Sequence, residues 1–112
     1  MAKHAIGIAW AVSNFGAIEN VLVRGSAGAD AGVAGISLRR RIPGPGLISH
    51  VVIDGFNVGI DVGDIQYGIT LEDVALHGQR VAGIRNGRNV LHIHDLRSDN
   101  HCPAIVGTGR EG

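Results

Sequence analysis

A segment of eight residues that occurs four times in the same direction constrains this chain more than any other feature. The four copies align without gaps: IENVLVRG at 18–25, ISHVVIDG at 48–55, LEDVALHG at 71–78 and IHDLRSDN at 93–100. Repeats of this kind are typical of solenoids, because one repeat cannot bury its apolar face without its neighbours. The copies begin 30, 23 and 22 residues apart, and they predict a stack of similar coils.

A Gly-Ile pair marks a second position in each repeat. It occurs in AIGIAW, VAGISL, NVGIDV and VAGIRN, and CPAIVG provides a degenerate fifth copy. The isoleucines of these segments are Ile8, Ile36, Ile60, Ile84 and Ile105. Each repeat therefore contains at least two short apolar segments that are joined by turns.

Both segments have the character of β-strands. Apolar residues alternate, as in Val21-x-Val23 and Val51-x-Ile53, which is the period of a pleated strand. Glycine supplies 18 of the 112 residues, and each glycine would cost a helix about 1 kcal/mol. The sequence shows neither the six-residue rhythm of a left-handed β-helix nor the helical return segment of a leucine-rich repeat. We predict an all-β fold: a right-handed parallel β-helix of about four and a half coils, with residues 1–112 as one segment.

The repeat also explains LEDVALHG, which at first resembles a catalytic acid–base group. Glu72 holds the second position of the repeat and is expected to point outward, and His77 stands beside the closing glycine. Asp73 holds the third position, where we predict a bend. The equivalents of Asp73 in the other copies are Asn20, His50 and Asp95. The closing position holds residues that tolerate a left-handed turn, namely Gly25, Gly55, Gly78 and Asn100.

The combined pattern, I-x-[NHD]-V-x-[VIL]-x-G alternating with [VA]-G-I-x-[VLN], resembles the pectate-lyase-like β-helix proteins over residues 5–106. It is most similar to bacterial proteins of the pectate lyase superfamily and to family 55 glycoside hydrolase-like proteins. The resemblance implies an extracellular protein that acts on or binds polysaccharides in a groove along its outer face. The catalytic strings of related polygalacturonases, N-T-D, D-D, G-H-G and R-I-K, do not occur. No catalytic residue is therefore carried over.

Outward side chains are the remaining candidates for contact with a sugar. The residue after each Gly-Ile pair is expected to face out, which makes Asp61 and Arg85 neighbours on adjacent coils. Asp64, Gln66 and Tyr67 follow in a turn, so Asp61, Asp64, Gln66, Tyr67 and Arg85 are the candidate carbohydrate-binding residues. Asp61 and Asp64 are weak catalytic candidates, because a glycosidase needs two carboxylates about 5–9.5 Å apart. The alternative is an ion pair with turn capping.

Other ligands have little support in the sequence. His92, His94 and His101, with Asp95 and Asp99, form the densest titratable group, but spacing alone does not make a metal site, and we predict neither metal nor cofactor. The formal net charge is zero and the only basic run is Arg39, Arg40 and Arg41, so no nucleic-acid partner is expected. The apolar run after Lys3 is too short for a secretory signal, and no segment has the length of a membrane span.

The ends of the predicted solenoid raise a separate question. End coils need polar caps, because otherwise the core cross-section and the strand edges are open. Neither cap is visible in the sequence. We therefore expect an internal piece of a longer β-helix, or an oligomer whose subunits cover the ends. Three functions follow as hypotheses: a segment of a secreted glycoside hydrolase or polysaccharide lyase, a non-catalytic β-helix that binds glycans or a surface, and an oligomeric structural stalk.

Overall fold

The computed structural model describes residues 4–11, 15–26, 31–39 and 44–108, and these residues form strands and turns without a helix. The strands are β1 (Ile6–Ala9), β2 (Gly16–Arg24), β3 (Ala34–Ser37), β4 (Gly46–Asp54), β5 (Val58–Gly63), β6 (Ile69–His77), β7 (Ala82–Asn86), β8 (Leu91–Asp99) and β9 (Ile105–Gly107). Long and short strands alternate along the chain. Within the described ranges, no helix could span a membrane.

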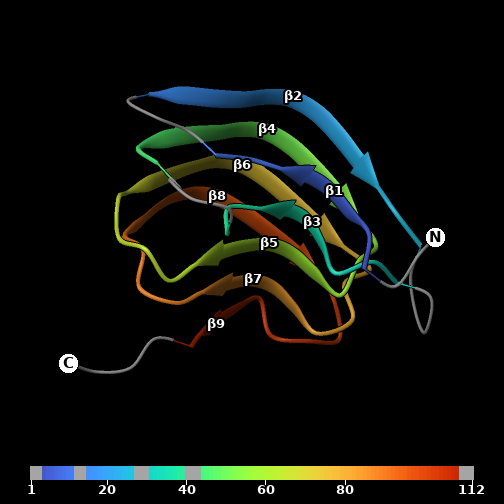
Figure 1. Cartoon of the computed structure of the whole chain (residues 1–112). Coiled ribbons are helices and arrows are strands. Elements are labelled where there is room, and N and C mark those ends of the chain that lie inside the picture. Colours follow the sequence, from blue (N-terminus) through green and yellow to red (C-terminus); the bar gives the residue numbers. More distant parts are fainter. Residues whose placement is uncertain (1–3, 12–14, 27–30, 40–43, 109–112) are drawn as a thin grey trace.

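Two parallel sheets enclose the core (Figure 1). The four long strands stack in the order β2-β4-β6-β8, and the five short strands stack in the order β1-β3-β5-β7-β9. Because the chain alternates between the two stacks, it winds as a parallel β-solenoid, as the repeat predicts. The predicted count of four and a half coils is slightly too high, since the solenoid has about three turns.

The ungapped alignment of the repeats is also the register of the sheets. Ile18 pairs with Ile48, Ile48 with Leu71, and Leu71 with Ile93 along the long strands. The Gly-Ile pairs align in the same way in the short strands, where Ile36 pairs with Ile60. Each repeat position therefore becomes a column of side chains that runs along the solenoid axis.

Each long strand turns a corner at the third position of its repeat. The four residues there have left-handed backbones, with φ of 57° at Asn20, 52° at His50, 51° at Asp73 and 59° at Asp95. Asn, Asp and His tolerate this conformation better than other non-glycine residues. The corner lets both halves of a strand send apolar residues inward, as Leu71 and Val74 do in β6. The predicted bend is confirmed.

The closing position of the repeat differs from its prediction in two of its four copies. Gly55 and Gly78 have φ of 94° and 73°, but Gly25 and Asn100 are not left-handed. Gly25 is required for space instead, because a Cβ atom there would lie 2.7 Å from the ring of the buried Phe56. Glycine is therefore required at this position for its left-handed backbone in two coils, and for its lack of a side chain in another.

The core is continuous through the middle coils and open at both ends. Ile36, Ile48, Ile60, Leu71 and Ile84 are fully buried. The hydrophobic residues that pack on this core but stay partly exposed are Ile8, Trp10, Ile18 and Val21 at the first coil, and Leu91, Ile93 and Leu96 at the last. The middle coils thus stabilise the fold, and the end coils expose its cross-section.

Candidate functional site

Asp61, the centre of the predicted sugar-binding rim, lies on β5 and is only 2% exposed. The guanidinium of Arg39 covers it, with Nη1 3.2 Å from Asp61 Oδ1 and 3.4 Å from Oδ2. Arg85 on β7 adds a longer ion pair, 3.7 Å from Nη1 to Asp61 Oδ2. The predicted proximity of Asp61 and Arg85 is therefore correct. The expectation that Asp61 faces solvent is wrong, because Arg39 folds over it from the preceding coil.

Asp64, Gln66 and Tyr67 lie in the turn between β5 and β6 and are exposed. The buried Asn89 holds this turn, because its Oδ1 accepts hydrogen bonds from the backbone N–H groups of Tyr67, at 3.0 Å, and Gly68, at 2.7 Å. A turn that is anchored in this way presents its side chains from a fixed backbone. Tyr67 itself is 52% exposed.

A small cavity of about 190 Å³ adjoins the turn. Its lining residues are Leu38, Arg39, Gly63, Asp64 and Ile65. Arg39 and Asp64 provide a hydrogen-bond donor and an acceptor at its mouth. A ligand that enters from solvent would meet these two side chains before Asp61, which lies beneath Arg39. The roles of Asp61 and Asp64 in catalysis stay a prediction.

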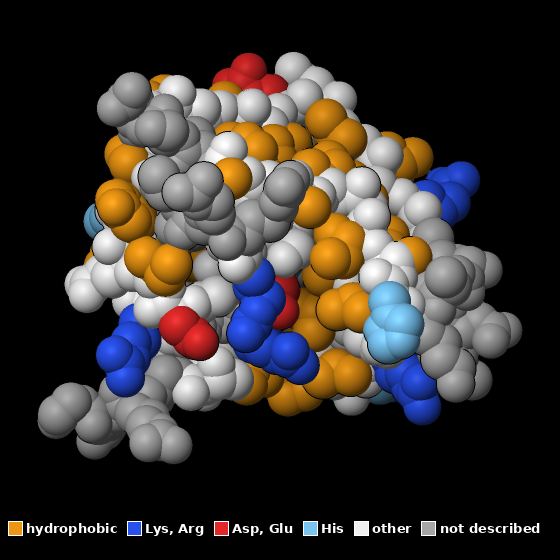
Figure 2. Space-filling model, in the orientation of Figure 1, with side chains coloured by type: hydrophobic (Ala, Val, Ile, Leu, Met, Phe, Trp, Pro, Cys, Tyr) orange, Lys and Arg blue, Asp and Glu red, His pale blue; other side chains and the backbone are white. Residues whose placement is uncertain are grey.

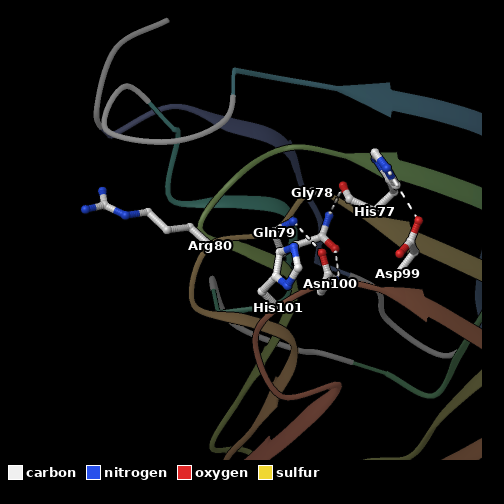
Figure 3. Close-up of a pocket in the computed structure, with 7 residues that line it drawn as sticks. All are labelled: His77, Gly78, Gln79, Arg80, Asp99, Asn100 and His101. Carbon is white, nitrogen blue, oxygen red and sulfur yellow. Dashed lines mark hydrogen bonds and ion pairs between the residues drawn. The ribbon is translucent and has the colours of Figure 1, made fainter.

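A larger cavity of about 570 Å³ lies at the corner that follows the long strands (Figure 3). Its lining residues are His77, Gly78, Gln79, Arg80, Asp99, Asn100 and His101. Figure 3 shows that the Arg80 side chain extends away from the other residues, while His77 and Asp99 face each other. The sequence analysis placed His77 and Asp99 in different copies of the repeat and missed Gln79 and Arg80, and the stacking of β6 on β8 brings these residues together.

Gln79 and Asn100 give this corner its rigidity. The Nε2 group of Gln79 donates to the carbonyl oxygens of Ile53, Gly55 and His77 at 2.9–3.1 Å. Asn100 donates from Nδ2 to Gln79 Oε1 at 2.8 Å and accepts from the Gln79 backbone N–H at 2.7 Å. Gln79 and Asn100 are therefore engaged inside the protein, and the exposed side chains of the cavity lining are His77, Arg80, Asp99 and His101.

A column in which basic and acidic side chains alternate crosses the outer face of the long strands. Arg24, Asp54, His77 and Asp99 occupy the same register position on β2, β4, β6 and β8. Arg24 Nε lies 3.6 Å from Asp54, and the two ring nitrogens of His77 lie 3.2 Å from Asp54 and 3.7 Å from Asp99. Exposed pairs of this kind each contribute at most about 1 kcal/mol. The seventh position of the repeat was the sequence signal for this column.

A second polar group lies at the corner of the long strands. His50 Nδ1 is 2.7 Å from Asp73 Oδ2, and Arg97 donates to Asp73 Oδ1 at 3.3 Å. Figure 2 shows that charged side chains are few and scattered on the face it presents, with hydrophobic side chains over much of the surface between them.

The predicted titratable group does not converge on one point. His92 and His94 are exposed on β8, Asp95 lies at the bend of that strand, and Asp99 and His101 line the larger cavity. In the part of the chain that the structure describes, no three His, Cys, Asp or Glu side chains are placed to hold a metal ion. Of the predicted basic run, Arg40 and Arg41 lie outside the described residues, and Arg39 is the partner of Asp61.

The two stacked sheets and the turns next to the two cavities define a parallel β-solenoid whose polar turns are anchored by side-chain hydrogen bonds. Comparison with known proteins gives no match to a family model, to a curated protein or to a solved structure.

Proposed function

We propose that this chain is the carbohydrate-binding segment of a polysaccharide-acting β-solenoid protein, with Tyr67 as the principal sugar contact and Asp64 and Gln66 beside it. The observation that carries the proposal is the exposure of the Tyr67 ring on a turn that Asn89 anchors. An aromatic face can pack on the apolar face of a sugar ring, and carboxylate and amide groups can bind its hydroxyls. An anchored turn loses little conformational freedom on binding.

The residues around the turn extend the contact. Arg39 and Asp64 line the adjoining cavity and supply a donor and an acceptor. The Arg39 side chain is half exposed although its guanidinium binds Asp61, so unused N–H groups remain for a ligand. Arg85 supports this arrangement from the next coil through Asp61. In this proposal Asp61 positions the two arginines, and Asp64, Gln66 and Tyr67 touch the sugar.

The proposed class of protein rests on the pattern of the repeat. Its resemblance to pectate-lyase-like β-helix proteins, and to family 55 glycoside hydrolase-like proteins among them, supports an extracellular polysaccharide as the ligand. Glycoside hydrolase or lyase chemistry belongs to the same proposal. A non-catalytic glycan-binding role is the second candidate, and the burial of Asp61 beneath Arg39 favours it, because that carboxylate is not open to a substrate.

The test is binding of the chain to insoluble polysaccharides, including polygalacturonate and a β-1,3-glucan, in a depletion assay. We expect Tyr67→Ala to weaken binding about tenfold through loss of the ring contact. Val81→Ala is the matched control, because Val81 is exposed to a similar degree, 46%, in the turn between β6 and β7. Equal binding by both variants, or no binding of the unmodified chain to any of these polymers, would contradict the proposal.

The same preparation separates the two candidates. Release of reducing ends or of unsaturated products that is lost in Asp64→Asn would support catalysis at this rim. Binding that is retained without product release would support the non-catalytic role.

A further inference from the structure

We propose that this chain forms an antiparallel dimer with two-fold symmetry, through the outer face of the long strands beyond their left-handed corners. Two columns of side chains make up this surface, which we call the two-column face. It is formed by Leu22, Val52, Ala75 and Arg97 in the first column and by Arg24, Asp54, His77 and Asp99 in the second. The interaction is independent of sugar binding at Tyr67, because the two-column face leads into the turns that follow the long strands, whereas Tyr67 lies in a turn that precedes one.

The first column is largely apolar and open to solvent. Leu22 is 55% exposed and Val52 43%, and Ala75 is half-buried. Because β4 is hydrogen-bonded to a strand on each side, Val52 is exposed through the outer face of the sheet and not through an end of the stack. Neighbouring members of the column are about 4.8 Å apart, so the three residues form a continuous apolar strip. An apolar strip with a polar rim is a feature of protein interaction sites.

The second column identifies the partner as another copy of this chain. Along the solenoid axis it reads basic, acidic, basic, acidic, from Arg24 on β2 to Asp99 on β8. Reversal of this order gives acidic, basic, acidic, basic, so a second copy that is turned end over end opposes an acidic side chain to every basic one. The opposed pairs are Arg24 with Asp99 of the second copy and Asp54 with His77 of the second copy, and each pair occurs twice. All four side chains are accessible, since the least exposed of them, Asp54, still has 38% of its side-chain surface open to solvent.

The same rotation also matches the first column. Its axis runs along the strand direction, midway between β4 and β6, so Val52 lies against Ala75 of the second copy at the centre of the contact. Leu22 lies against Arg97 of the second copy, whose aliphatic stem can cover the leucine while its guanidinium stays with Asp73. A single two-fold axis therefore satisfies both columns.

A parallel dimer does not match in this way. A two-fold axis along the solenoid would exchange the two columns and place Val52 against Asp54 of the second copy, which desolvates a carboxylate on an apolar side chain. The antiparallel contact is isologous, so it closes with two subunits and does not lead to further growth. It spans about 20 Å along the solenoid axis. Because this is small for a specific interface, we expect a dissociation constant in the micromolar range.

Analytical ultracentrifugation over a wide concentration range tests the dimer, with circular dichroism to confirm the β fold of each sample. We expect a monomer–dimer equilibrium, and Val52→Lys should raise its dissociation constant about tenfold, because two ammonium groups would be placed at the apolar centre of the contact. Val90→Lys is the matched control, since Val90 is 42% exposed but lies in the turn between β7 and β8, outside the two-column face. A chain that is unfolded or monomeric at every concentration, or equal effects of the two substitutions, would overturn the proposal.

Cross-linking tests the antiparallel orientation. Leu22→Cys and Arg97→Cys are made separately in a Cys102→Ser background, and a short bismaleimide joins cysteines that lie opposite each other. In the dimer, position 22 faces position 97 of the second copy, but it lies three strand spacings, about 14 Å along the axis, from its own symmetry mate. A mixture of the two variants should therefore cross-link, while each variant alone should not. Cross-linking of a single variant as efficient as that of the mixture, or none in the mixture, would contradict the antiparallel dimer.

Discussion

Arg39 covers the buried carboxylate of Asp61, with its guanidinium nitrogen 3.2 Å from one oxygen and 3.4 Å from the other. The pair is asymmetric, since the Arg39 side chain is 50% exposed and that of Asp61 only 3%. Water can therefore bind Arg39 if the ion pair is lost, but it cannot easily reach Asp61 to replace Arg39 as its hydrogen-bond donor. This asymmetry leads to the first prediction.

Arg39→Ala should lower the free energy of unfolding by about 1–3 kcal/mol, because it leaves a buried carboxylate with only the longer contact to Arg85. Urea denaturation measures the change. Arg97→Ala is the matched control, because Arg97 is 76% exposed and pairs with the accessible Asp73, and its loss should cost no more than about 1 kcal/mol. If Arg39→Ala lowers the free energy of unfolding no more than Arg97→Ala does, the ion pair with Arg39 is not needed to keep Asp61 buried.

Asp73→Val should destabilise the protein by about 1–2 kcal/mol, since a β-branched residue strongly disfavours the left-handed backbone at that corner. Glu72→Val tests the neighbouring residue, which is exposed in extended strand and should tolerate valine. Thermal melts of the two variants and of Asp73→Asn make the comparison. If Asp73→Val and Asp73→Asn have the same melting temperature, the left-handed backbone at position 73 does not restrict the residue type.

Gly59→Ala should be strongly destabilising, by about 2–3 kcal/mol, because the new methyl group would clash with the backbone of the neighbouring strand β7 and with the core side chain of Leu76. Its Cβ atom would lie 2.6 Å from the carbonyl oxygen of Gly83 and 3.0 Å from Leu76 Cδ2. Gly107→Ala is the control, since its Cβ atom would approach only Asn86 O, at 4.0 Å. Chemical denaturation should separate the two variants clearly, and similar midpoints would argue against the close packing around Gly59.

Gln79→Glu should destabilise the protein although the two side chains are nearly equal in size. It replaces an amide donor that binds three carbonyl oxygens with a carboxylate that only accepts hydrogen bonds. We expect a loss of about 2–4 kcal/mol in the free energy of unfolding at neutral pH. Gln66→Glu makes the same chemical change on the exposed turn between β5 and β6 and should be nearly neutral. Equal stability of the two variants would mean that Gln79 does not bridge the coils.

The register and the corners could be predicted because they repeat. Ile18, Ile48, Leu71 and Ile93 align in the sequence for the same reason that they pair in the sheet, and the polar third position is the position of the left-handed bend. The ion pair of Asp61 with Arg85 followed from the same alignment, because both residues belong to the repeat.

The burial of Asp61 and the role of Gln79 could not be predicted from the pattern. Arg39 belongs to a run of arginines that resembles a solvated turn, and only the path of the chain after β3 directs its side chain back over Asp61. Gln79 follows the closing glycine and has no equivalent in the repeat. Its three carbonyl partners come from two successive coils, a relationship that single-strand periodicity does not contain.

The corners of the solenoid differ in length while its walls do not. Nine residues separate β2 from β3, but only three separate β4 from β5, and the strands of both sheets keep their register. An insertion at a corner therefore leaves every wall contact in place, whereas a single inserted residue within a wall would reverse the facing of all that follow. Evolution can thus change the length and sequence of the turns without changing the fold, and new loops can be grafted at the same points.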